Sequence, residues 1–385
     1  RYATPEWLLS AVRHAWPDNW QEILDNFNLH PPLSLRVNPL HNSREAYLAR
    51  LKQAGLSASP SQLSPWAVTL EKPVPVTRLP GFADGDVSVQ DAAAQLSPLL
   101  LGALENHRVL DACAAPGGKT GQLAELTEQG FFLKALDMPD RIHLIEENLQ
   151  RLGLTAQISA ADATQPGQWW DGEPYDVVLL DAPCSGDGIL RKDKKMLRYW
   201  SVADAQRQAQ QQKSLLRAAF HMLRPGGFLV YSTCSLSLEE NEEVLQGLVD
   251  KYPGQVEILP SEIIDPVPLP TAVAERYPAN FAHIVRIWPH LHDTEGACVA
   301  RIRKEGTTAW PAREADAATW TTESASGAAA SQARERLETQ WDFAMPCPSG
   351  QILELDRRHL YSRPREAAAF QIHFPFYIRA GMRIA

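Results

Sequence analysis

The sequence has few cysteines, no long apolar run and no excess of positive charge. Its five cysteines are an odd number scattered over 385 residues without a Cys-X-X-Cys pair, which argues against a disulfide framework and a structural zinc site. No stretch approaches the ~18 apolar residues that span a bilayer. With a formal net charge of -9 there is no global attraction to nucleic acid, so any RNA or DNA surface must be local.

The chain start also lacks a targeting pattern. Residue 1 is arginine rather than methionine, and no charged, apolar and small-residue signal follows it, so we interpret the start as a trimmed end. Reduced thiols and the missing membrane span predict a cytoplasmic protein with no membrane partner. We expect a monomer without a bound metal.

The first region of the chain, residues 1–84, contains both helix and strand patterns. Apolar spacing indicates helices over 7–16 and 44–55, while 32–38 and 66–71 are typical of short strands. A chain of this length has room for two to three domains of ~150 residues. We interpret this first region as a small α/β module.

Residues 85–304 alternate regularly between strand and helix patterns. Short β-rich runs separated by helices of ten or more residues predict a mostly parallel sheet with helices on both faces, a Rossmann-like α/β domain. The five expected parallel strands lie at 107–113, 130–137, 155–162, 175–183 and 226–234. Helices are expected over 142–153 and 203–223, and an antiparallel edge hairpin over 283–289 and 297–304.

The remainder of the chain changes composition. Residues 305–334 are rich in Ala, Thr, Ser and Glu with little to bury, which indicates a linker. Residues 335–385 regain strand-like runs and carry six arginines against three acids after Gly350. We interpret this last segment as a small β-rich basic module that is possibly incomplete at the chain end.

The strongest local signal is Asp-Ala-Cys-Ala-Ala-Pro-Gly-Gly-Lys-Thr over residues 111–120, where a strand enters a glycine loop and then a helix near Thr120. Glycine lets the backbone approach a ligand, and a helix N-terminus presents free N–H groups. A nucleotide-like ligand is therefore expected. The loop residues concerned are Cys113, Ala114, Ala115, Pro116, Gly117, Gly118 and Lys119.

Two interpretations compete for this loop. Gly-Gly-Lys-Thr followed downstream by Asp181 resembles a P-loop and its magnesium-binding acid, but a P-loop needs glycine where Cys113 stands. The other interpretation is an S-adenosylmethionine site. Asp137 ends the second strand about 20 residues past the glycines, as ribose-binding acids do, and Asp162 ends the third strand, where it could face the adenine.

Two cysteines fall at the ends of neighbouring strands on the same sheet edge. Cys184 lies in the turn after the fourth strand and Cys234 directly after the fifth. A buried cysteine is usually a small hydrophobic residue, but a Pro-Cys turn and a strand end are not core positions. A thiolate at either place would be a nucleophile beside the ligand of the glycine loop.

Three motifs together resemble the Sun (NSUN-type, RsmB/RsmF-like) family of RNA cytosine-5 methyltransferases. They are DACAAPGGKT at 111–120, LLDAPCSGDG at 179–188 and YSTCSLSLEENE at 231–242, within a similarity that extends from Tyr2 to Lys304. The resemblance implies a Rossmann-like methyltransferase fold, S-adenosylmethionine as cofactor and RNA as substrate. It also points to 16S rRNA or an assembling small ribosomal subunit, and to a PUA-like character for the basic C-terminal module.

Roles follow from the resemblance residue by residue. Cys234 would be the nucleophile that adds to carbon 6 of cytosine, Cys184 would assist release of the enzyme, and Asp181 would hydrogen-bond or protonate ring nitrogen 3. The loop from Cys113 to Lys119, with Asp137, Asp162 and Asp181, would line the cofactor site. The spacing after Asp137 is one residue shorter than is usual in the family.

Basic residues supply the candidate RNA contacts. The run at 191–195 contributes Arg191, Lys192, Lys194 and Lys195 directly after the Cys184 turn, where it is either a solvated loop or a phosphate-binding segment. Arg36 and Asn38 serve either RNA contact or the folding of the first module. A P-loop-like NTPase and a catalytically silent RNA-binding protein on the same fold are the alternative functions.

Overall fold

The structure is a computed structural model that describes residues 6–104, 106–126, 131–192, 202–306, 351–355 and 360–364. The chain divides into two compact units, residues 1–309 and 310–385. All candidate site residues named above belong to the first unit. Lys194 and Lys195 lie outside the described residues.

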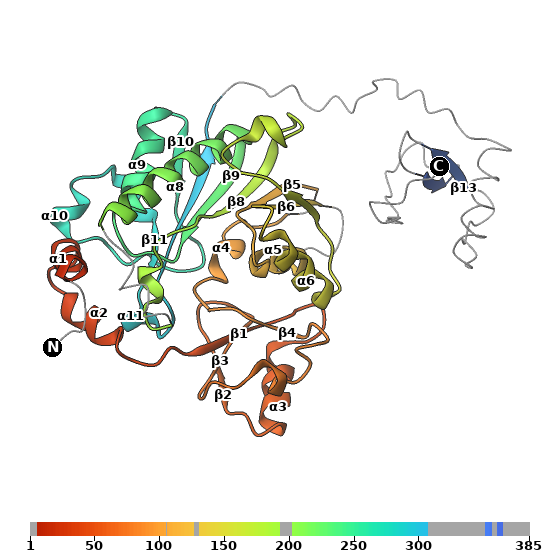
Figure 1. Ribbon diagram of the computed structural model, residues 1–385, viewed down its shortest axis with the longest axis horizontal. Coiled ribbons are helices and arrows are strands. Elements are labelled where there is room, and N and C mark those ends of the chain that lie inside the picture. Colours follow the sequence, from red (N-terminus) through yellow and green to blue (C-terminus); the bar gives the residue numbers. More distant parts are fainter. Residues whose placement is uncertain are drawn as a thin grey trace. The chain divides into compact units, whose positions relative to one another are not determined.

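A large sheet with strand order β10-β12-β9-β8-β5-β6-β7 forms the centre of the first unit (Figure 1). The five strands from β9 to β7 in this order are all parallel, as the sequence predicts. They are β5 (Arg108–Ala112), β6 (Phe132–Asp137), β7 (Gln157–Ala160), β8 (Tyr175–Asp181) and β9 (Leu223–Thr233).

The sheet continues beyond β9 with antiparallel strands. β12 (Ala297–Lys304) pairs with β9 on one side and with both β10 (Val256–Leu259) and β11 (Val285–Ile287) on the other. The expected hairpin between residues 283–289 and 297–304 is therefore confirmed. Strand β10 was not predicted from the sequence.

Alternate residues of the central strands enter two separate cores, because successive strand side chains point to opposite faces. Leu110 and Val178 pack toward α8 (Val202–Met222) and α9 (Glu242–Lys251). Val109 and Val177 pack on the opposite face toward α4 (Leu96–Leu99) and α5 (Gly118–Glu125). Helix α6 (Ile142–Leu152) lies beside α5 and covers β6 through Ile145 and Leu149. These layers confirm the Rossmann-like α/β fold.

A second, four-stranded sheet has the order β2-β3-β1-β4 and is antiparallel. Its strands are β1 (Leu33–Val37), β2 (Ala58–Pro60), β3 (Ala67–Leu70) and β4 (Val87–Val89), and α3 (Arg44–Gln53) packs on it through Tyr47 and Leu51. Because β4 pairs with β1, this small sheet extends past the predicted boundary at residue 84.

The first two helices do not belong to the core of the small sheet. α1 (Glu6–Ala15) and α2 (Trp20–Asn26) share a hydrophobic cluster with residues of the large domain, Leu190, Leu236 and Trp288. The N-terminal region is thus joined to the large domain at both of its ends, rather than forming one separate module over residues 1–84.

Short helical segments complete the first unit. They are η1 (Val76–Arg78), η2 (Pro166–Gln168), η3 (Asp187–Ile189), α10 (Thr271–Ala274), η4 (Ala279–His283) and α11 (Pro289–His292). In the second unit the described residues form one antiparallel pair, β13 (Gln351–Leu355) with β14 (Leu360–Pro364). The expected linker at 305–334 and most of the expected module at 335–385 lie outside the described residues. No helix that the structure describes has the length and apolarity to cross a membrane.

Candidate active site

A cavity of about 390 Å³ opens where β5, β8 and β9 end, and we call it the strand-end cavity. Its volume is in the range of small-ligand sites, and it lies at the carboxyl edge of parallel strands, where such sheets bind ligands. Its polar and sulfur-bearing lining residues are Asp91, Ser97, Cys113, Lys119, Arg141, Asp181, Cys184, Lys192, Ser232, Thr233, Cys234 and Glu295.

The loop that forms one wall follows β5 and has an unusual backbone. Cys113 and Gly117 both adopt the left-handed conformation, with φ of 63° and 94°. A Cβ atom on Gly117 would also lie 3.1 Å from the Cα atom of Ile145. Both the positive φ and this close contact therefore favour glycine at this position. Helix α5 starts at Gly118, two residues before the predicted start near Thr120.

The loop is held in place by hydrogen bonds from neighbouring elements. Asp137, at the end of β6, accepts from the backbone N–H of Ala115 at 2.7 Å. Asn148 on α6 donates to the carbonyl oxygen of Gly117 at 2.9 Å. Asp137 is buried and does not line the cavity; it acts on the loop from behind.

A second buried carboxylate lies in β5, just before the loop. Asp111 is fully buried in β5 and accepts a hydrogen bond from Thr120 Oγ1 at 2.6 Å. Burial raises the pKa of Asp111 to about 7, and the nearby negative charge of Asp181 acts in the same direction against the Thr120 hydrogen bond. The motif residue that precedes the loop is therefore a structural acid that titrates near neutrality.

The two predicted cysteines meet at the cavity. Their Sγ atoms lie 3.1 Å apart, and the backbone N–H of Cys234 donates to Cys184 Sγ at 3.3 Å. Both thiols are free. The hydrogen bond with Cys234, together with burial, raises the pKa of Cys184 well above its usual value. Cys184 is therefore a protonated thiol at neutral pH.

The turn that carries Cys184 is anchored by a carboxylate from the Cys234 segment. Glu240 is fully buried and accepts from the backbone N–H of Ser185 at 3.0 Å and from the Ser185 hydroxyl at 3.2 Å. Gln208 and Gln212 on α8 donate to the Pro183 carbonyl oxygen at 2.6 and 2.9 Å. The positions of the two thiols are thus fixed by one connected network.

Two glycines bring a third segment against this pair. Gly188 donates its N–H to the carbonyl oxygen of Cys234 at 3.0 Å, and its own carbonyl accepts from the N–H of Gly296 at 2.8 Å. A Cβ on Gly188 would lie 2.6 Å from the Cys234 carbonyl oxygen, and one on Gly296 would lie 2.8 Å from the Cα of Gly188. Any side chain at either position would force these backbones apart.

Asp181 joins the cysteine wall to the glycine-loop wall. One of its carboxylate oxygens forms an ion pair with Lys119 Nζ at 2.5 Å, and the other accepts from Ser232 Oγ at 2.7 Å. The side chain remains about one-third exposed (36%) at the cavity. Asp181 can therefore still bind a ligand while both of its oxygens are oriented.

Asp162 is placed differently from the other predicted cofactor residues. It accepts hydrogen bonds from the N–H and hydroxyl of Thr164 at 2.8 and 2.7 Å, and it does not line the strand-end cavity. Partial burial alone would raise its pKa, but the hydrogen bonds of Thr164 and Gln165 lower the pKa below its usual value. Its described contacts close a turn after β7.

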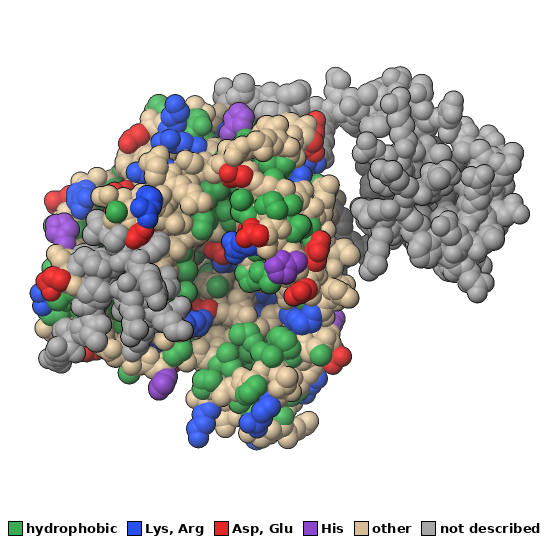
Figure 2. All heavy atoms as spheres, in the orientation of Figure 1, with side chains coloured by type: hydrophobic (Ala, Val, Ile, Leu, Met, Phe, Trp, Pro, Cys, Tyr) green, Lys and Arg blue, Asp and Glu red, His purple; other side chains and the backbone are tan. Residues whose placement is uncertain are grey.

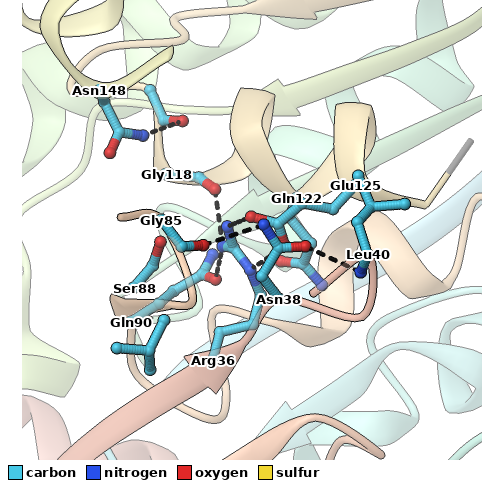
Figure 3. Close-up of polar contacts among 12 residues, drawn as sticks. Arg36, Asn38, Leu40, Gly85, Ser88, Gln90, Gly118, Gln122, Glu125 and Asn148 are labelled. Carbon is cyan, nitrogen blue, oxygen red and sulfur yellow. Dashed lines mark hydrogen bonds and ion pairs between the residues drawn. The ribbon is translucent and has the colours of Figure 1, made fainter. Parts of the chain in front are cut away.

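The structure corrects the assignment of Arg36 and Asn38 as RNA contacts. Both side chains are buried, and Arg36 reaches from β1 to both carboxylate oxygens of Glu125 on α5, at 2.7 and 2.8 Å (Figure 3). Arg36 also donates to the Gly118 carbonyl oxygen at 2.8 Å, and Asn38 donates to the Gly85 carbonyl oxygen at 3.0 Å. Both residues fasten the small sheet to its surroundings and offer no free group to RNA.

Arg191 is corrected in the same way. It is buried, donates to the Thr294 carbonyl oxygen, and its Nε lies 3.4 Å from Glu295 Oε1. Lys192 keeps 41% of its side chain exposed at the cavity rim, with its Nζ 3.7 Å from Asp91 Oδ2. Of the predicted basic run, Lys192 is the member that the structure describes as accessible to a ligand.

Sequence reasoning missed two acids that the structure brings to the cavity. Asp91 accepts from Thr294 Oγ1 at 2.8 Å, and Glu295 lines the wall beside Gly296. Neither stands at the end of a predicted parallel strand, so the strand-end argument could not find them. Within the described residues no group of three or more His, Cys, Asp or Glu side chains is arranged to hold a metal ion.

The comparisons with known proteins agree with this geometry. A family model described as "16S rRNA methyltransferase RsmB/F" matches residues 98–303, and one described as "Methyltr_RsmF/B-like, ferredoxin-like domain" matches residues 4–77. The first covers more than half of the chain. The ferredoxin-like match includes α1 and α2 as well as most of the small sheet.

Curated relatives carry the same family name. Ribosomal RNA small subunit methyltransferase B of Pseudomonas syringae pv. tomato is 44% identical over 259 residues, which cover 67% of this chain and 58% of the relative. The protein of the same name from Vibrio cholerae is 44% identical over 256 residues, 66% of this chain and 58% of the relative. The chain thus spans somewhat over half the length of these relatives.

Solved structures share the fold. The methyltransferase homologue from Pyrococcus horikoshii superposes with a TM-score of 0.67 at 28% identity, over 79% of this chain and 96% of that chain. NSun6 from the same organism, whose crystal structure contains SFG, gives a TM-score of 0.69 at 22% identity over 80% and 100% of the two chains. The motif resemblance, the Rossmann-like sheet and the family match agree, and the chain belongs to the RsmB/F family of S-adenosylmethionine-dependent methyltransferases.

Proposed function

We propose that this chain methylates carbon 5 of a cytosine in RNA, with 16S rRNA or an assembling small ribosomal subunit as substrate, through a covalent cysteine adduct. The observation that carries the proposal is the contact of two thiols, 3.1 Å apart, in the cavity that also borders the glycine loop and Asp181. The small-subunit rRNA methyltransferases among its relatives support the choice of substrate. Such a substrate implies a cytoplasmic enzyme, and we expect it to act as a monomer.

The residues around the glycine loop fit S-adenosylmethionine. The ligand is a positively charged sulfonium, and the strand-end cavity is bordered by the carboxylates of Asp91, Asp181 and Glu295. A Cβ on Gly118 would meet no atom within 4 Å, so the loop is open there. When bound, the cofactor supplies an electrophilic methyl group. The residues proposed to hold it in the cavity and along the adjoining loop are Cys113, Ala114, Ala115, Pro116, Gly117, Gly118, Lys119 and Asp181. Asp137 and Asp162, which do not line the cavity, are proposed to hold the part of the cofactor that extends beyond it.

Cys234 and Asp181 are the residues proposed to activate the base. Carbon 5 of cytosine is a poor nucleophile, and addition of the Cys234 thiolate to carbon 6 makes it an enamine carbon able to attack an electrophilic methyl group. Addition of the thiolate places negative charge on the ring, and Asp181 in its carboxylic-acid form neutralises that charge by donating a hydrogen bond or its proton to nitrogen 3. Lys119 and Ser232 orient that carboxyl group. The nucleotide must be unstacked to reach this cavity.

Cys184 is proposed to assist the release of the product. A water molecule accepts the carbon 5 proton, the freed electron pair forms the double bond between carbons 5 and 6, and the bond between Cys234 Sγ and carbon 6 breaks. The departing sulfur then needs stabilisation. Cys184 is a protonated thiol in hydrogen-bonding contact with Cys234 Sγ, so it can donate to the developing thiolate.

RNA phosphates are proposed to contact the segment from Arg191 to Lys195, through the accessible Lys192 and the adjoining Lys194 and Lys195. Arg191 supports that segment from within. On the face drawn in Figure 2, Lys and Arg side chains alternate with Asp and Glu rather than forming one continuous basic area. Binding that depends on a short basic segment agrees with the net charge of -9.

The two alternatives have less support. A P-loop NTPase would need glycine at position 113, where this chain has cysteine, and the family match is to methyltransferases. A silent RNA-binding protein would have no need for two thiols in one cavity. Calorimetric titration distinguishes the proposed methyltransferase from a P-loop NTPase. S-adenosylmethionine should bind and ATP should not, and replacement of Gly117 by alanine should strongly weaken the binding of S-adenosylmethionine.

Single cysteine variants test the covalent mechanism with methylation of unmodified 16S rRNA. Cys234→Ala should abolish methyl transfer and form no adduct, because carbon 5 is never activated. Cys184→Ala should leave methylated RNA attached through Cys234, seen as a slow-migrating protein–RNA species under denaturing conditions. Sequencing of the trapped RNA then identifies the target cytosine.

The double variant is the matched control, since it should lose the trapped species again. A trapped complex with Cys234→Ala instead of Cys184→Ala would reverse the two assignments. Full turnover in both single variants would end the covalent mechanism.

A further inference from the structure

Glu295 stands in the wall of the strand-end cavity next to the cysteine pair. Its neighbour Gly296 donates to Gly188, and Gly188 donates to the carbonyl oxygen of Cys234, at 2.8 and 3.0 Å. Two backbone hydrogen bonds therefore separate Glu295 from the proposed nucleophile. The glycine contact fixes this spacing, because neither Gly188 nor Gly296 can carry a side chain.

The carboxylate of Glu295 is buried but incompletely paired. The residue is 1% exposed, and in the described part of the chain neither of its oxygens has a hydrogen-bond partner. Its one counter-charge is Arg191, whose Nε lies 3.4 Å from Oε1 without making a hydrogen bond. Buried carboxylate oxygens are normally satisfied by donors, so this group has capacity for a ligand that brings N–H groups into the cavity.

The position of Glu295 indicates which ligand brings them. Gly296 packs against the Cys184 and Cys234 segments, which makes this the side where the base must lie for attack at carbon 6. Cytosine presents an amino group at carbon 4, whereas uracil presents an oxygen there. A carboxylate accepts a hydrogen bond from the amino group and repels the oxygen.

We propose, resting on the function above, that Glu295 is a specificity-determining residue that accepts a hydrogen bond from the exocyclic amino group of the target cytosine. Asp181 and Glu295 then read adjacent atoms of one base edge, nitrogen 3 and the amino group at carbon 4. Arg191 balances the charge of Glu295 from the protein side.

Adduct formation on two fluorinated bases tests this role. The cytosine mapped above is replaced in the RNA by 5-fluorocytidine or by 5-fluorouridine, and the denaturation-resistant complex is measured with S-adenosylmethionine present. Fluorine at carbon 5 cannot leave as the proton does, so either base accumulates as an adduct once attacked. The wild-type protein should strongly prefer fluorocytidine.

Glu295→Gln should lower the rate on fluorocytidine about 10-fold and reduce the cytidine-to-uridine ratio at least as much, since it removes a charged acceptor for the amino group. The amide can also donate to the uracil oxygen. Glu295→Asp keeps the charge beside Arg191 but shortens the acceptor, and it should give an intermediate ratio. Glu257→Gln, which removes a half-exposed acid on β10 that pairs with Arg303 of β12, is the matched control and should change neither value.

The outcomes separate this inference from the function on which it rests. An unchanged ratio in both Glu295 variants would overturn it, as would a ratio that stays constant while both rates fall together, the result of a purely structural role. A 10-fold loss of S-adenosylmethionine affinity by calorimetry with the ratio unchanged would assign Glu295 to the cofactor. Absence of any adduct with the wild-type protein would overturn the proposed function itself and this inference with it.

Discussion

Two buried arginine–glutamate pairs differ in how completely they are satisfied. Arg36 and Glu125 join the small sheet to α5, and both carboxylate oxygens accept hydrogen bonds from the guanidinium group (Figure 3). Arg191 and Glu295 join the Cys184 turn to the start of β12, and the glutamate oxygens accept none within the described residues. Both pairs are nearly inaccessible to solvent.

The difference concerns function rather than burial. A buried ion pair whose donors and acceptors are all used holds its surroundings in place and has nothing left for a ligand. A buried pair with unused acceptors beside a cavity is less favourable for the isolated protein, and a ligand with donors can satisfy it. The first pair is therefore a structural connection, and the second is part of a binding site. The variants below test this distinction.

The largest expected effect is from Arg36→Met. It leaves the Glu125 carboxylate buried without its partner, and removal of one member of a buried pair lowers the free energy of unfolding by about 3 to 5 kcal/mol. Urea unfolding measures it. Arg36→Lys keeps the charge but not the two parallel hydrogen bonds, and it should lie between the variant and the wild type. Equal stability of all three proteins would contradict a structural role.

Arg191→Met should have a smaller effect that depends on pH. Burial already raises the pKa of Glu295, and Arg191 counteracts that shift. Without Arg191, the pKa of Glu295 in the folded protein rises further above its value in the unfolded chain. The penalty is then absent at low pH and grows as pH rises toward the folded-state pKa. We expect a loss of about 2 kcal/mol at pH 8 that shrinks toward pH 5.

A loss that is the same at both pH values would show that Glu295 does not respond to Arg191. Chemical unfolding at pH 5 and pH 8 decides the matter, with the wild-type protein measured at each pH. The control is Arg303→Met, since Arg303 pairs with acids at the exposed sheet edge, where screening leaves little effect.

Isosteric replacement of the two glutamates gives a third comparison. Glu125→Gln loses one of two charged hydrogen bonds and should lower the free energy of unfolding by about 1 to 3 kcal/mol. Glu295→Gln breaks no hydrogen bond within the described residues, although it removes the counter-charge of Arg191, and should therefore lower the free energy of unfolding by less than Glu125→Gln does. Thermal unfolding of both variants measures the difference, and a reversed order would contradict the distinction drawn between the pairs.

The smallest effect on stability is expected from Lys192→Ala, which alters an accessible side chain at the cavity rim. Its effect should be on RNA binding alone, where loss of one phosphate contact lowers the slope of log affinity against log salt by about 0.7 to 0.9. Titration of 16S rRNA at several salt concentrations measures the slope. An unchanged slope would place the RNA surface elsewhere.

The sequence was informative wherever a local pattern determines the structure. Alternating strands and helices predicted the parallel sheet, and the ends of its strands predicted that Cys184 and Cys234 would meet, because parallel strands end at a common edge. The side chain of Arg36 could not be assigned in this way, since its partner Glu125 is 89 residues away in the chain. A basic residue in a strand looks the same whether it contacts RNA or a buried acid.

Glu295 was missed for a related reason. It follows a short helical turn and precedes an antiparallel strand, so it belongs to none of the patterns that mark ligand-binding edges. What reveals it is the tertiary contact of Gly296 with Gly188. Because β12 runs antiparallel to β9 and pairs Cys298 with Thr233, the residues just before β12 come to the end of β9 that carries Cys234.

The contact between Gly188 and Gly296 also bears on how the protein is made. Both cysteines of the pair have been synthesised once the chain reaches residue 234, but the wall that contains Glu295 and the strand that borders β9 follow some sixty residues later. A nascent chain ending before β12 would contain the glycine loop and both thiols, yet no completed cavity around them. Reactive thiols would thus be confined to their pocket only when the last strand of the sheet inserts.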